Sequence, residues 1–249
     1  IGGSLILLTG FAIRSTFGLF QIPIAQEFLW ARSEFSLAIA IQNLAWGIAT
    51  PFFGAFAEKY GDRKAILIGI ILYATGLLIS SQSSSPEGHQ FLNIIIGFGI
   101  AGTGFGPILA VVGRATSPEK RSLALGITTA AGSAGQVVGP PLTSILLETM
   151  SWSSVFIIFA FIILFTIILL PLIKSNSKKI NNHKNEDLGK VLVKAFKDPT
   201  YMMIFLGFFS CGFQLAFITA HFPAFIAESS APIGQNSLIS FVCNSTASL

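Results

Sequence analysis

Charged residues are scarce in this sequence. Only 10% of the 249 residues are Asp, Glu, Lys or Arg, whereas a soluble domain carries about 25%. Hydrophobic residues make up 52% of the chain, and its mean hydropathy is +0.74. The composition therefore excludes an ordinary water-soluble domain and predicts that most of the surface faces lipid.

Cysteine and the polar aromatic residues are also scarce. The two cysteines, Cys211 and Cys243, stand in apolar text without paired spacing, which excludes a disulfide framework or a zinc-finger pattern. There are 24 Phe against 3 Trp and 3 Tyr, and Phe has no polar tip that needs a partner in lipid. No Ser-His-Asp set, carboxylate pair or metal-ligand cluster is visible, so we expect neither an enzyme nor a cofactor or metal site.

Long apolar runs are abundant. A hydrocarbon core of about 30 Å takes about 20 helical residues to cross, and seven segments of that size occur, at 1–24, 35–57, 65–81, 91–112, 123–147, 155–173 and 201–227. An eighth begins near Ile233. Because both ends of the sequence stand in apolar text, we expect a fragment with about seven complete membrane spans.

The positions of Lys and Arg predict the orientation in the membrane. The loops at 59–64, 114–121 and 174–197 hold 13 of the 15 basic residues. Basic loops face the cytoplasm, so the N-terminal side is expected to be cytoplasmic too. The net charge of +4 thus belongs to membrane topology and does not indicate a nucleic-acid partner.

The central loop has a pattern of its own. Within 185–198, apolar residues recur at the spacing of one helix face and three lysines occupy the other. Asn185 is the expected N-cap. We therefore predict a short helix at the cytoplasmic lipid interface.

The loop between the second and third spans reads Gly54-Ala-Phe-Ala-Glu58-Lys59-Tyr60-Gly61-Asp62-Arg63-Lys64. It resembles the signature loop of the major facilitator superfamily, whose usual form is G-x-L-A-D-R-x-G-R-[RK]. An acid, Glu58, replaces the usual Asp, and Asp62 adds a second acid, so the ion pairs of the loop are expected to differ. A carboxylate at Glu58 could meet a helix N-terminus or an Arg across the interface between halves. The candidate gating residues are Gly54, Glu58, Lys59, Gly61, Asp62, Arg63 and Lys64.

Two further segments support the resemblance. In the fifth span, Gly135-x-x-x-Gly139-Pro140 is similar to an element of superfamily antiporters, although close helix packing explains the same spacing. The first two spans contain Arg14-Ser-Thr-Phe-Gly18, Trp30-Ala-Arg32, Gln42-Asn43 and Trp46-Gly47. With these residues they are similar to the branch of oxalate–formate exchangers and monocarboxylate porters. The dinucleotide pattern that begins at Gly97 lies inside a membrane span without a preceding strand, so we reject it.

The resemblance implies an all-α membrane protein with twelve spans in two six-helix halves. This sequence would then comprise the N-terminal half at 1–173, a cytoplasmic central loop at 174–200 and the start of the second half at 201–249.

Arg14 is the most informative single residue, because it lies deep in the first span. A charge at this depth costs at least about 2.5 kcal/mol on insertion scales. No Asp or Glu stands mid-membrane in the sequence to pair with it. We expect Arg14 to meet an anionic substrate group in a central cavity; the alternative is a structural partner elsewhere in the fold.

Several other polar residues stand inside spans and are candidates to line the same cavity. Gln21 follows Arg14 at helical spacing, and each glutamine could instead bond between helices. His221 is a candidate proton carrier because its charge changes near neutral pH. With Arg14, the candidate substrate-binding set is Gln21, Gln42, Trp46, Gln136 and Gln214.

These features favour a secondary transporter of small organic anions that resides in the inner membrane. It would work by alternating access with a coupling ion, either a proton or a counter-anion. An exporter of drugs or metabolites is the alternative within the superfamily. A membrane sensor that transports nothing is the alternative outside it.

Overall fold

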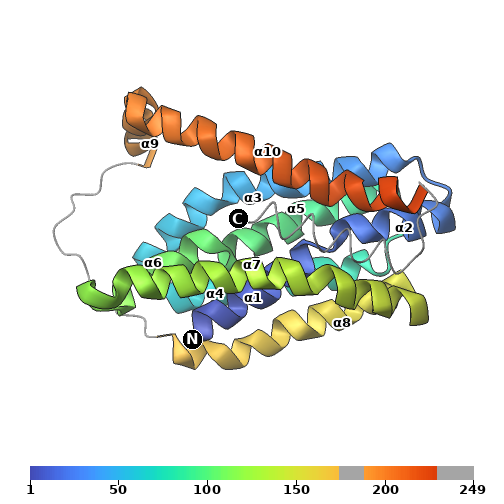
Figure 1. Ribbon diagram of the computed structural model, residues 1–249, viewed down its shortest axis with the longest axis horizontal. Helices are drawn as coiled ribbons and strands as arrows, with labels where there is room; N and C mark the ends of the chain where they lie inside the picture. The colour runs from blue at the N-terminus through green and yellow to red at the C-terminus, as the bar shows by residue number, and fades with distance from the viewer. Residues whose placement is uncertain (174–187, 229–249) are drawn as a thin grey trace.

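The structure is a computed structural model in which residues 1–173 and 188–228 are described (Figure 1). Every regular element in these ranges is a helix, as the sequence predicts. The elements are α1 Gly2–Arg14, η1 Phe17–Phe20, α2 Gln21–Phe28, α3 Arg32–Tyr60, α4 Asp62–Ser80, α5 Pro86–Thr103, α6 Phe105–Ala115, α7 Pro118–Thr149, α8 Trp152–Phe165, η2 Thr166–Leu172, α9 Leu188–Lys197 and α10 Pro199–Glu228.

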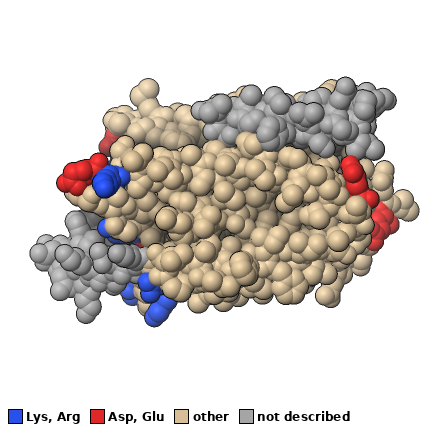
Figure 2. Space-filling view, turned by 60° about the horizontal axis from the view of Figure 1, so that its bottom comes forward, with Lys and Arg blue, Asp and Glu red and all other residues tan. Residues whose placement is uncertain are grey.

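Six of these segments are long and apolar enough to cross a membrane: Gly2–Phe28, Ser33–Tyr60, Asp62–Ser80, Pro86–Ala115, Trp152–Leu172 and Pro199–Pro223. The predicted fifth span forms α7, which is long enough but rich in Gly, Ala, Ser and Thr, so its mean hydropathy is lower. On the face shown in Figure 2, charged side chains gather at the two ends of the bundle and a broad uncharged band separates them. That distribution is typical of a multi-pass membrane protein.

Two predicted spans are broken helices. In the first, α1 ends at Arg14, and a turn at Ser15 and Thr16 and the 3-10 helix η1 precede α2. Pro23 lies in the first turn of α2, where its missing N–H and its ring are tolerated. The fourth breaks at Gly104, whose extended backbone separates α5 from α6. These breaks change which side chains share a face.

Glycines hold the helices close together. A Cβ on Gly102 would lie 2.6 Å from Gly69 Cα, so α5 and α4 pack backbone to backbone. A Cβ on Gly135 or Gly139 would overlap the backbone of α1 at Leu8 or Ala12. The Gly-x-x-x-Gly spacing on α7 is therefore occupied by helix packing, which is one of the two interpretations that the sequence allows.

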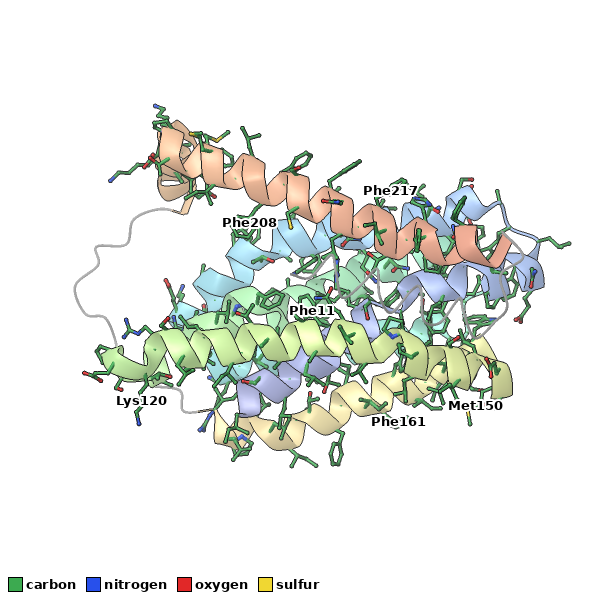
Figure 3. All side chains as sticks on the ribbon, in the orientation of Figure 1. Phe11, Lys120, Met150, Phe161, Phe208 and Phe217 are labelled. Carbon is green, nitrogen blue, oxygen red and sulfur yellow. The ribbon has the colours of Figure 1, made fainter. Side chains whose placement is uncertain are left out.

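The last long helix, α10, meets the first six spans at one end. Figure 1 shows α10 close to the end that holds α2 and farther away toward α9. At the near end Gly18 packs directly on the Thr219 backbone, with Pro223 Cγ 3.3 Å from where a Cβ would stand. Large apolar side chains on α10, among them Phe208 and Phe217, are exposed (Figure 3).

The predicted amphipathic helix is present as α9, beginning at Leu188. Its Phe196 ring lies 5.9 Å from Tyr201 and 5.8 Å from Phe205, which joins it to α10. The predicted cap Asn185 and the eighth span near Ile233 lie outside the described residues.

Candidate functional site

Arg14 is the last residue of α1, at the point where the first span breaks. Its side chain is buried, with 7% of its surface exposed. Its Nη2 donates to Asn43 Oδ1 at 3.0 Å, and its guanidinium carbon stands 4.6 Å from the centre of the Trp46 ring. The Phe11 ring, labelled inside the bundle in Figure 3, lies 5.7 Å away. Two aromatic faces and one amide thus stabilise the buried cation.

The orientation of Asn43 is fixed by its own helix. Asn43 Nδ2 donates to the backbone oxygen of Ile39 at 2.9 Å, and a carbonyl can only accept. The Asn43 amide oxygen must therefore face Arg14. This bond occupies Nη2, while Arg14 Nη1 is buried without a hydrogen-bond partner among the described residues. A buried charged donor of this kind is costly unless a ligand or a further segment meets it.

A small cleft lies beside Arg14. The helices that form it are α1, η1, α3 and α10, so it lies where the last described span meets the first ones. Small-molecule sites occur preferentially between helices of a bundle. The residues that line it are Arg14, Phe17, Gly18, Ile39, Gln42, Asn43 and Thr219.

The structure places two of the candidates from the sequence near Arg14 and the other three outside the cleft. Gln42 lines the cleft and Trp46 contacts Arg14. Gln21 donates to Ser36 Oγ at 2.8 Å and is not among the cleft residues, because the break after Arg14 removes it from that helical face. Gln136 is buried on α7 with its Oε1 unpaired in the described structure. Gln214 is exposed on α10 and also lies outside the cleft.

The two described histidines in or beside the spans have contrasting surroundings. His221 is exposed on α10, with its ring 5.2 Å from that of Phe217. His89 is buried near the start of α5. It is hydrogen-bonded to Ser80 through Nδ1 and packs on Trp30 and Trp152. The sequence analysis missed His89 because it adjoins a polar loop.

The signature loop is anchored within the first six spans. Gly61 has φ 100°, a value that L side chains rarely adopt, and joins α3 to α4. Asp62 accepts a short charged hydrogen bond from Arg114 at the end of α6. Arg63 donates from Nε to the Ile173 oxygen at 2.7 Å and thereby caps η2.

The remaining residues of the loop are free for other contacts. Glu58 is exposed, and no ion pair joins it to any described residue. Asp62, and not Glu58, is thus the acid that pairs here. Lys59 and Lys64 are also exposed, with Lys59 Nζ 5.3 Å from the Tyr60 ring. A Cβ on Gly54 would meet nothing within 4 Å.

Three residues of the site have weak sequence signals. Asn43 stands next to Gln42, but its bond to Arg14 crosses 29 positions. Asn93 holds Gln42 from 51 positions away. Thr219 reaches the cleft from the distant α10. Polarity within an apolar run was the available signal for all three.

The site offers binding groups and no reactive set. Within 1–173 and 188–228, no three His, Cys, Asp or Glu side chains gather where they could hold a metal ion. The cleft presents a fixed cation, amides and aromatic faces. Groups of these kinds bind anions in proteins by charge and hydrogen bonding.

The chain is similar to known membrane proteins along nearly all its length. It is 28% identical over 223 residues to the uncharacterized MFS-type transporter YcxA of Bacillus subtilis, which covers 84% of this chain and 52% of that protein. It is 31% identical over 144 residues to monocarboxylate transporter 13 of Bos taurus, covering 57% of this chain and 33% of that protein. The chain therefore spans about half the length of YcxA and less of the second relative.

A solved structure shares the fold. A bacterial homolog of the human lysosomal transporter Spinster, in an inward-facing and occupied conformation, superposes with a TM-score of 0.71 at 14% identity. The match covers 98% of this chain and 57% of that one. The sequence profile of the Major Facilitator Superfamily matches residues 3–247. The chain thus belongs to the Major Facilitator Superfamily, a family of multi-pass membrane transporters.

Proposed function

We propose that this chain provides the anion-recognition half of a secondary transporter for small organic anions. The observation that carries the proposal is the free Nη1 of the buried Arg14, beside a cleft to which α10 also contributes. A buried cation without an acid partner among the described residues is suited to a carboxylate that enters and leaves. The similarity to a monocarboxylate transporter agrees with this chemistry.

The transport cycle would need no covalent step and no enzyme activity. A carboxylate would pair with Arg14 at the meeting point of 1–173 and α10, and the two halves would then rock around it. The exposed acid and bases of the signature loop, Glu58, Lys59 and Lys64, are available to contact the second half at the inner side. A proton or a counter-anion would couple the movement, with His221 a candidate carrier.

The proposed location is the inner membrane, with the basic end in the cytoplasm. On the face shown in Figure 2 the blue side chains lie at one end and red ones lie at both. Because Lys and Arg determine the orientation of a membrane protein and Asp and Glu contribute little, the end with the basic side chains is assigned to the cytoplasm.

Uptake by the complete protein in proteoliposomes tests the proposal. Labelled monocarboxylates should enter with saturation and should compete with one another. Movement of a lipophilic cationic dye without movement of the acids would favour the drug exporter instead. Movement of neither would favour a sensor on the same fold.

A further inference from the structure

The amide of Gln42 is held in one orientation by a chain of hydrogen bonds that begins at a backbone carbonyl. The carbonyl oxygen of His89 accepts from Asn93 Nδ2 at 2.8 Å. Because a carbonyl cannot donate, Asn93 must turn its own oxygen the other way. Gln42 Nε2 donates to that oxygen at 2.9 Å. Both amides are buried, at 2% exposure each, so a flip would break a bond that water could not replace.

This chain of bonds determines which atom of Gln42 remains for a ligand. The Gln42 nitrogen is used on Asn93, and no other hydrogen bond of its side chain occurs among the described residues. Gln42 lines the same cleft as Arg14. Its Oε1 is therefore an acceptor at the cleft, without a donor among the residues that the structure describes.

The other polar groups of the cleft differ from this one. Asn43 is bonded at both ends of its amide, to Ile39 and to Arg14. The Thr219 hydroxyl donates along its own helix to the Leu215 carbonyl. Among the described residues, the polar side-chain atoms of the cleft that make no hydrogen bond are thus one charged donor, Arg14 Nη1, and one neutral acceptor, Gln42 Oε1.

We propose that the cleft selects organic anions that carry a hydrogen-bond donor beside the anionic group, with 2-hydroxy acids as the simplest class. This inference rests on the proposed function. The carboxylate would pair with Arg14 and the hydroxyl would donate to Gln42. A site built to bond a hydroxyl discriminates against the analogue that lacks it, because its own polar atom is then buried unpaired.

In this scheme Asn93 is a positioning residue. It is absent from the lining of the cleft and acts by holding the Gln42 nitrogen. Without Asn93 the Gln42 amide can turn either its nitrogen or its oxygen to the ligand. Removing Asn93 should therefore change the preference between two acids more than it changes the protein's capacity to bind acids.

The test compares matched acids on the complete purified protein. Binding constants are measured for glycolate against acetate and for 2-hydroxybutyrate against butyrate, so that chain length is controlled. We expect each hydroxy acid to bind about tenfold more tightly than its partner. Gln42→Leu and Asn93→Leu should each reduce that ratio to about one. Thr103→Val is the matched control, because Thr103 is buried on α5, the helix of Asn93, and its hydroxyl donates to the Gly99 carbonyl of that helix. The ratio in this variant should match that of the wild type.

The outcomes separate this inference from the proposed function. Arg14→Gln should weaken both members of each pair, which reports on anion recognition itself. If both plain and hydroxy acids bind the wild type equally and depend on Arg14, the donor preference is overturned and anion recognition by Arg14 stands. If no acid binds, both proposals are wrong. The ratio in the wild type needs no variant, so a misfolded Asn93→Leu leaves the test decisive.

Discussion

Replacing Arg14 tests the central feature of the site. Arg14→Gln removes the charge but keeps a side chain of similar reach, and Arg14→Lys keeps the charge without the planar fork. If Nη1 binds the substrate carboxylate, glutamine loses one charge-assisted hydrogen bond in a poorly hydrated cleft. Such a bond is worth about 1.5–3 kcal/mol, which corresponds to a roughly ten- to hundredfold loss of affinity.

Lysine should have an intermediate effect. Its ammonium can approach the carboxylate or Asn43 Oδ1, but it cannot reproduce both contacts and the stacking on Trp46 in the geometry of arginine. We therefore expect Arg14→Lys to weaken transport and Arg14→Gln nearly to abolish it at low substrate concentration. The matched control is Arg121→Gln, which removes the same charge from an exposed position.

The assay measures the amount of folded protein and the apparent affinity on the same preparation. A purely structural Arg14 would make Arg14→Gln scarce but leave the surviving molecules with normal affinity, because the cost then falls on folding. Normal affinity in Arg14→Gln would therefore refute anion recognition by this residue. Reduced affinity at normal abundance would support it.

Three further predictions concern the scaffold. In a protein without its native cysteines, a reagent confined to the outside of cells should label a cysteine at position 82, in place of the exposed Gln82, and not one in place of Lys59; labelling at 59 alone would reverse the topology. Gly135→Ala should lower the free energy of unfolding by about 1–3 kcal/mol, because the added Cβ would overlap α1. Gly126→Ala should leave it unchanged, because nothing lies within 4 Å of its Cβ position. Asp62→Asn should cost about 1–3 kcal/mol of stability, because the charged bond to α6 is lost; unchanged melting would show that this ion pair is dispensable.

The helices could be predicted because lipid leaves the backbone few choices. A span must satisfy its own N–H and C=O groups, so an apolar run of about 20 residues indicates a helix. The turn at Gly61 and the amphipathic helix α9 were predictable for similar local reasons, since a positive φ and an amphipathic face both depend on neighbours in sequence. Arg14 was identified by the same reasoning, from its charge within an apolar run.

The contacts between spans could not be predicted in this way. Helical spacing puts Gln21 on the face of Arg14 only if the helix continues, and the break at Ser15 and Thr16 prevents this. The acid that pairs in the signature loop depends on where Arg114 lies, 52 positions from Asp62. Two buried amides that orient one another across 51 positions leave no periodic signal.

The close approach at Gly18 also affects how α10 can move. The two helices meet there with glycine on one side and the Thr219 backbone on the other. Because glycine has no side chain, α10 can pivot at this contact without a change of side-chain rotamer at Gly18. From Thr219 back to Pro199, α10 is a lever of about 30 Å at 1.5 Å per residue. A tilt of about 10° around Gly18 would carry the α9 end through about 5 Å, roughly one helical turn. A small rotation at Gly18 would thus be enough to move α9 by about one helical turn relative to the first six spans.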